Sequence, residues 1–131
     1  MMTEPLNKFV EASLKRADEC LKGAKILLQE GELHGAVSRA YYGVFHAAKA
    51  ILYTKGIKAK THSGARALFG EHIIKPRIMG KEFADILRAL FNARQLSDYE
   101  VYAELDRDEV QTLLAEANKF LGAVKEILGR E

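Results

Sequence analysis

The chain has 131 residues, a length that suits one domain with a single core. Its content of 48% hydrophobic and 29% charged residues is typical of a folded globular protein and argues against a disordered one. No stretch is apolar for long enough to cross a bilayer, and a net charge of +2 by itself favours no class of partner.

The start of the chain and its cysteine content predict a cytoplasmic protein. The first residues, MMTEPLNKF, lack the charged and then apolar pattern of a secretory signal. Cys20 is the only cysteine, which excludes an internal disulfide and a metal site built on cysteines.

Apolar residues recur every three or four positions along most of the chain, which predicts amphipathic helices. The first predicted helix follows residues 10–28, and the second follows residues 37–52. Gly31 and Gly56 come shortly after them, and glycine is a common helix stop.

The middle of the chain predicts two further helices. A short one begins near Thr61 or Ser63, and the hydroxyl of either residue could cap it. Pro76 and Gly80 then mark a connection, and a fourth helix follows residues 83–91.

The last predicted helix follows residues 110–128. Asp106 and Glu109 have the spacing of a capping box, which would satisfy free backbone donors at its start. No alternating strand pattern occurs anywhere in the sequence. We therefore predict an all-α fold for residues 1–131, an antiparallel four-helix bundle with one short additional helix in a single domain.

Charge is distributed unevenly along the chain. Residues 55–81 hold seven basic side chains and one acid, whereas residues 98–116 hold seven acids and one base. Such asymmetry can mark a surface for phosphates or for an acidic partner. Alternatively, the two segments face each other, within one chain or across a dimer.

Arg94 stands where the apolar stripe of the fourth helix predicts a core residue. A half-buried guanidinium needs partners, because desolvating it unpaired costs several kcal/mol, roughly. Asp98 lies one turn further on and can accept from it, and the hydroxyls of Tyr99 and Tyr102 follow. The pattern predicts either a structural ion pair or a ligand site formed by Arg94, Asp98 and Tyr99.

The second helix carries a companion set of polar side chains. Arg39, Tyr42 and His46 are spaced by three and four residues and therefore share one face. An arginine beside an aromatic ring and a histidine can hold a nucleotide by phosphate contact and stacking. The alternative is a solvated helix edge.

The start of the short helix is a candidate anion site at His62 and Ser63, because a helix N-terminus presents free N–H groups. Any capped helix start has such groups, so the signal is unspecific. The four histidines lack metal-ligand spacing, no glycine-rich phosphate loop is present, and no serine has a nucleophile context. We predict no metal and no cofactor.

Two segments carry a family resemblance. Residues 38–74 begin with SRAYYGVFHAAKA and include THSG, and residues 93–102 read ARQLSDYEVY. In this order and at these separations they resemble the HEPN domains, in particular the short, stand-alone branch found in archaea and bacteria.

The resemblance implies a four-helix bundle with a short extra helix that is usually a homodimer. Many short members are encoded beside a minimal nucleotidyltransferase and form a toxin–antitoxin-like pair with it. Others are metal-independent ribonucleases, in which an arginine holds the phosphate and a histidine a few positions later aids proton transfer at the RNA 2′-hydroxyl.

Carried over to this sequence, Arg94 matches the motif arginine, but no histidine occurs after His72. Asp98 and Tyr99 stand there instead, and an aspartate is ionised near neutral pH and cannot act as an imidazolium does. Arg94 and His46 therefore remain only candidates for catalysis. Tyr99 and Tyr102 lie near the position of a tyrosine that the nucleotidyltransferase modifies in some paired members.

Three hypotheses follow from these observations. In the first, a non-enzymatic or weakly active homodimer binds a nucleotide, RNA or a partner nucleotidyltransferase through a cleft around Arg94. In the second, His46 or His62 replaces the missing histidine in a ribonuclease toxin. In the third, Arg94 and Asp98 only stabilise a structural dimerisation module.

Overall fold

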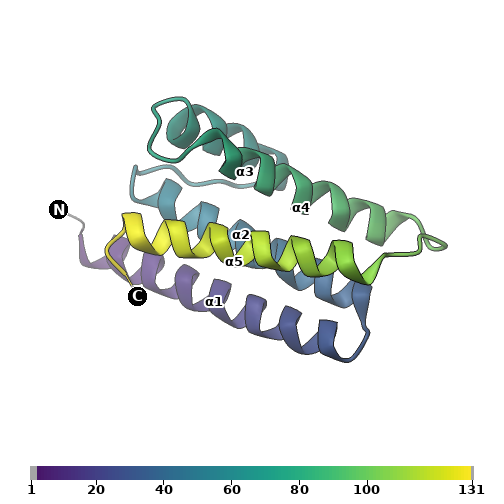
Figure 1. Ribbon diagram of the computed structural model, residues 1–131. Helices are drawn as coiled ribbons and strands as arrows, with labels where there is room; N and C mark the ends of the chain where they lie inside the picture. Colours follow the sequence, from purple (N-terminus) through teal and green to yellow (C-terminus); the bar gives the residue numbers. More distant parts are fainter. Residues whose placement is uncertain (1–2, 131) are drawn as a thin grey trace.

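The computed structural model describes residues 3–130 and consists of helices and their connections (Figure 1). In chain order these are α1 (Glu4–Gln29), α2 (Leu33–Tyr53), α3 (His62–Phe69), the π-helical turn η1 (Gly70–Ile74), α4 (Lys81–Tyr99) and α5 (Arg107–Ile127). No strand occurs in residues 3–130, and α1, α2, α4 and α5 alternate in direction. The predicted all-α bundle with a short additional helix is therefore confirmed. None of the helices in this part of the chain has the length and apolarity needed to cross a membrane.

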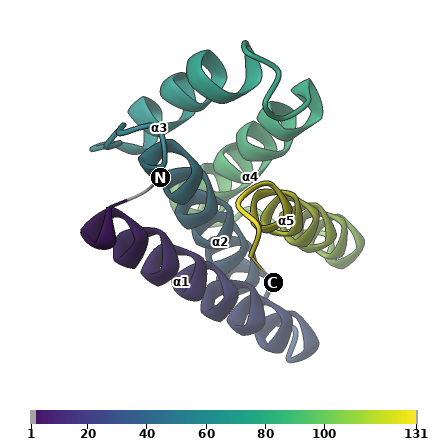
Figure 2. The ribbon, with the colours of Figure 1, turned by 90° about the vertical axis from the view of Figure 1, so that its left-hand side faces the viewer.

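Helix α2 lies at the centre of the bundle and contacts α1, α3, α4 and α5 (Figure 2). Eleven of its 21 residues are buried, and six of these are alanine or glycine: Ala36, Ala40, Gly43, Ala47, Ala48 and Ala50. Small side chains let neighbouring helix backbones approach closely while the larger residues fill the core. The composition of α2 thus explains why it occupies the centre of the bundle.

Gly43 of α2 lies directly against Leu21 of α1. A Cβ atom at this position would lie 2.4 Å from Cδ2 and 2.7 Å from Cγ of Leu21 on α1. Leu21 is only 4% exposed, so it has no free space into which it could move. The packing of α1 on α2 therefore requires glycine here.

The helix ends agree with most of the predicted signals. Gly31 and Gly56 follow α1 and α2 with φ angles of 78° and 75°, in the left-handed region that favours glycine. The Thr61 hydroxyl caps α3 by accepting from the backbone N–H of Gly64 at 2.9 Å.

The predicted capping box at the start of α5 is wrong. Asp106 does occupy the N-cap position, but its side chain makes no capping hydrogen bond, so the reciprocal pair with Glu109 is not formed. Both residues are exposed, where water can satisfy the carboxylates and the free N–H groups equally well.

The close approach at Gly43 predicts opposite effects for two glycine substitutions inside helices. Gly43→Ala should lower the free energy of unfolding by about 1–3 kcal/mol, because the new methyl group overpacks against Leu21. Gly122→Ala on α5 meets no atom within 4 Å and should raise it by up to about 1 kcal/mol through helix propensity. Urea denaturation of both variants measures the two effects, and a stabilising Gly43→Ala would contradict this packing.

Candidate functional site

A hydrogen bond joins the middle of α2 to the start of α3. The hydroxyl of Tyr41, a fully buried residue of α2, lies 2.6 Å from Nδ1 of His62, the first residue of α3. Burial raises the pKa of Tyr41 to about 12, so the hydroxyl stays protonated at neutral pH. The buried phenol thus has the polar partner that it needs, and His62 is held beside α2.

Arg94 of α4 lies over the rings of two tyrosines of α2. Its guanidinium carbon is 5.4 Å from the ring centre of Tyr41 and 5.1 Å from that of Tyr42. The ion pair that the one-turn spacing indicates is present, with Nε 3.1 Å from Oδ2 of Asp98. The Arg94 side chain is 22% exposed, so it is half-buried. Such burial is expected for a guanidinium that lies against the faces of aromatic rings.

Within the described chain the guanidinium is incompletely paired. The buried Nε–H is not aimed at the Asp98 oxygen well enough to donate a hydrogen bond, and Asp98 is the one carboxylate within 4.0 Å of Arg94 in residues 3–130. Leaving a buried charged donor without an acceptor is costly, and because Nε is buried, a ligand would have to meet the terminal nitrogens instead.

His62 is held neutral beside Arg94. Burial lowers its pKa first, and the positive charges of Arg94 and Lys49 lower it further. Its ring packs against Phe45 with the ring centres 4.5 Å apart. Because Nδ1 meets Tyr41, Nε2 is the ring nitrogen that can meet a ligand.

The other two predicted members on α2 are surrounded differently. Arg39 packs across Gly23 of α1, where its Nε would lie 3.1 Å from an added Cβ. The His46 ring centre is 6.4 Å from that of Tyr42, and burial together with Lys49, Arg16 and Arg39 lowers the His46 pKa to about 4. The structure therefore places Tyr42 and His62 beside Arg94. The positive charges that act on His46 come instead from Arg16 of α1 and from Arg39 and Lys49 of α2.

Ser63 lies in a recess of its own between α3 and α4. This recess of about 350 Å³ is lined by Ser63, Arg66, Ala67, Phe69, Ala84, Leu87 and Arg88. The guanidinium of Arg66 stacks 3.9 Å from the Phe91 ring centre, and Arg88 is paired with Asp85. Arg94 does not line this recess, so the structure divides the predicted anion site: His62 lies in the arginine cluster, and Ser63 lines the separate recess.

The two candidate modification residues lie at the surface. Tyr99 ends α4 and is 78% exposed, and Tyr102 in the following turn is 95% exposed. Leu96 and Val101 beside them are 50% and 84% exposed. An enzyme could reach both hydroxyls, which lie in a surface segment where exposed apolar side chains alternate with the carboxylates of Asp98 and Glu100.

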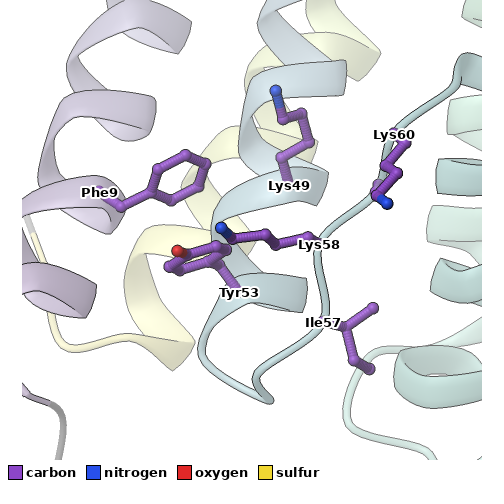
Figure 3. A pocket seen from close by; sticks show the side chains of 7 residues that line it. Phe9, Lys49, Tyr53, Ile57, Lys58 and Lys60 are labelled. Carbon is purple, nitrogen blue, oxygen red and sulfur yellow. The ribbon is translucent and has the colours of Figure 1, made fainter.

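A second recess, not anticipated from the sequence, lies where α1 meets the end of α2 (Figure 3). It has a volume of about 260 Å³ and is lined by Phe9, Lys49, Tyr53, Ile57, Lys58, Ala59 and Lys60. The Phe9 and Tyr53 rings stack with centres 3.9 Å apart. Part of this recess could have been predicted, because Lys49 and Tyr53 follow Tyr42 on one face of the same helix. Phe9 and Lys58 come from other segments, and their contribution could not be predicted from helical spacing.

The basic and acidic segments do not pair with each other within the chain. No ion pair in residues 3–130 joins residues 55–81 to residues 98–116. The connection after α2 starts at the end of the bundle opposite the α4–α5 connection (Figure 1). Within residues 3–130, no ion pair therefore supports the alternative that the two segments face each other within one chain.

The cluster around Arg94 suits an anion next to an aromatic ring. No group of three His, Cys, Asp or Glu side chains able to hold a metal occurs in the part of the chain described. The guanidinium can meet a phosphate through its terminal nitrogens, the Tyr42 ring is partly exposed, and Nε2 of the neutral His62 can meet a polar ligand group.

Comparison with known proteins agrees with this fold and with the sequence motifs. The family model of the HEPN domain matches residues 10–127. The chain belongs to the HEPN family. A "UPF0332 protein" of Thermotoga maritima is 34% identical to this HEPN chain over 121 residues, 92% of each chain. A Methanocaldococcus jannaschii protein named "Putative toxin MJ0605" is 30% identical over 98% of this chain and 95% of its own.

The lowered pKa of His46 predicts that acid destabilises this HEPN protein. Between the ordinary pKa of 6.5 and the folded value of about 4, the unfolded chain binds a proton on His46 that the folded chain does not. The free energy of unfolding should therefore fall as the pH is lowered through this range. In His46→Gln, urea denaturation from about pH 7 to about pH 4.5 should show a smaller loss than in the wild type. An equal loss in both proteins would mean that His46 is not held neutral by the fold.

Proposed function

We propose that this HEPN protein is a toxin-like member of its family that binds a nucleotide or RNA phosphate at Arg94. The carrying observation is the half-buried guanidinium, which lies over two tyrosine rings and has one carboxylate as its partner. A relative of nearly the same length carries the name of a toxin, which supports the toxin-like role.

Each neighbour of Arg94 has a part in this proposal. The planar guanidinium donates to phosphate oxygens through its terminal nitrogens, while the Asp98 carboxylate, 3.1 Å from Nε, offsets part of its charge. The partly exposed Tyr42 ring offers a stacking face for a base. Neutral His62 adds a polar contact without a second positive charge.

The proposal includes two protein partners that family membership predicts, a second copy of the chain and a minimal nucleotidyltransferase. The exposed apolar side chains at the end of α4, Leu96, Tyr99, Val101 and Tyr102, are the kind of surface that a partner covers. The hydroxyls of Tyr99 and Tyr102 would be the groups that a nucleotidyltransferase modifies.

Arg94→Ala should weaken binding of a short, labelled single-stranded RNA roughly 10- to 100-fold in fluorescence anisotropy. This range corresponds to one charge-assisted contact of about 1.5–3 kcal/mol. Arg107→Ala is the matched control, because it removes the same charge from an exposed position at the start of α5. It should bind like the wild type.

Circular dichroism must show that both variants keep the fold. If Arg94→Ala binds RNA as the wild type does, or if the wild type binds none, Arg94 is not the site. A loss of stability or of a dimer without any effect on binding would favour the purely structural role of the Arg94–Asp98 pair.

A second candidate function, metal-independent RNA cleavage, is favoured by the neutral imidazole of His62 beside Arg94. A neutral imidazole can take the proton of a ribose 2′-hydroxyl while an arginine holds the adjoining phosphate. Two histidines, His46 and His62, are candidates for the proton acceptor. The charge of Arg94 lowers the pKa of His62 but is not among the causes of the lowered pKa of His46.

If the protein cleaves RNA, His62→Ala should abolish cleavage and His46→Ala should retain it. Gel analysis of end-labelled RNA incubated with a chelator present measures both variants. Cleavage that survives His62→Ala at intact fold would exclude this mechanism, and cleavage lost only in His46→Ala would transfer the role to that residue.

A further inference from the structure

A stripe of aromatic and basic side chains follows the outer face of α2. Its members are Tyr42, Phe45, His46, Lys49 and Tyr53, and each is partly exposed. From Tyr42 to Tyr53 the helix advances by roughly 16 Å, at about 1.5 Å per residue. Tyr42, Phe45 and Tyr53 pack against the core with part of each side chain and remain partly exposed, so the stripe also presents ring surface outside the core.

Contacts between rings and charges continue along the stripe from the Arg94 cluster. Arg94 covers Tyr42 at one end. In the middle, the Lys49 ammonium lies 5.2 Å from the Phe45 ring centre, and Phe45 in turn packs on His62. Lys49 therefore lies between the phosphate site proposed above and the recess at the other end of α2.

The recess at the far end has an aromatic wall with cations around it (Figure 3). Lys49 lies 6.0 Å from the ring centre of Phe9, and Lys58 lies 5.7 Å from that of Tyr53. No carboxylate comes within 4.0 Å of Lys49, Lys58 or Lys60 in residues 3–130. Its volume of about 260 Å³ is just below the roughly 300–1,000 Å³ of pockets for drug-sized ligands, which suits one base or nucleotide.

We propose that this recess is a second nucleotide subsite, and that a single strand of RNA runs along α2 from Arg94 to Lys58. The inference rests on the proposed binding of phosphate at Arg94 and extends it to a strand of several nucleotides. Rings that alternate with cations fit a single strand, because bases stack on the rings while phosphates meet the cations. A phosphopeptide would meet the cations but has no bases to stack on the exposed ring surface.

The test compares Lys58→Ala with Lys55→Ala, a control that removes the same charge from the same connection without touching the recess. Binding of a short single-stranded RNA should weaken roughly threefold or more in Lys58→Ala and stay unchanged in Lys55→Ala. The slope of log affinity against log salt concentration should become shallower by about 0.7 in Lys58→Ala only.

Nuclear magnetic resonance locates the strand directly in the wild type. Added RNA should shift the backbone amide signals of residues 57–60 and Tyr53 as well as those around Arg94 and His62. A single nucleotide should shift the Arg94 region at lower concentration than the far recess.

The outcomes separate this inference from the function on which it rests. If Arg94→Ala weakens RNA binding but Lys58→Ala and Lys55→Ala behave alike, the second subsite is overturned and the Arg94 site stands. If Arg94→Ala has no effect, the proposed function itself fails. Amide shifts along the stripe that follow protein concentration and not RNA would mean that a second copy covers this face, which also overturns the subsite.

Discussion

The hydrogen bond between Tyr41 and His62 is the constraint on which the candidate site depends. Tyr41 is buried among the bundle helices, and its hydroxyl would lose its hydrogen bonds to water without a partner in the protein. The start of α3 supplies that partner. As a result, the phenol ring is fixed under Arg94 and the imidazole of His62 is fixed beside it. One buried polar contact thus positions groups from three helices.

The same hydrogen bond decides what His62 can do chemically. If the Tyr41 hydroxyl donates to Nδ1, then Nε2 of neutral His62 carries the hydrogen and can only donate to a ligand. If Nδ1–H donates to the Tyr41 oxygen, Nε2 presents a lone pair and can accept a proton, but the buried Tyr41 O–H then has no acceptor among the hydrogen bonds of residues 3–130. Phosphate binding agrees with the first tautomer, whereas proton removal from a 2′-hydroxyl requires the second. The choice between binding and cleavage therefore rests on one proton inside the α2–α3 contact.

The fold and part of the site follow from sequence because they depend on short-range spacing. Periodicity gives the helices, and a one-turn spacing gives the pairing of Arg94 with Asp98. The contact of Tyr41 with His62 could not be predicted, because it depends on the path of the connection after α2. Tyr41 lies on an apolar stripe and is indistinguishable there from an ordinary core residue. The Asp106–Glu109 pattern has the correct spacing too, but water competes with the cap at an exposed helix start.

Helix α2 has two roles that use different sides of the helix: it packs closely against its neighbours, and it presents the stripe of rings and cations. Its inner sides carry alanine and Gly43 so that α1 and the other helices can approach, and its outer stripe carries rings and cations. Because the small residues bring the neighbouring helices close, Phe9 of α1 reaches Tyr53 and Arg94 of α4 reaches Tyr42. Close packing on the inner sides is thus what assembles both ends of the outer stripe. A larger residue at position 43 would act on the site through helix spacing alone, although it touches none of the site residues.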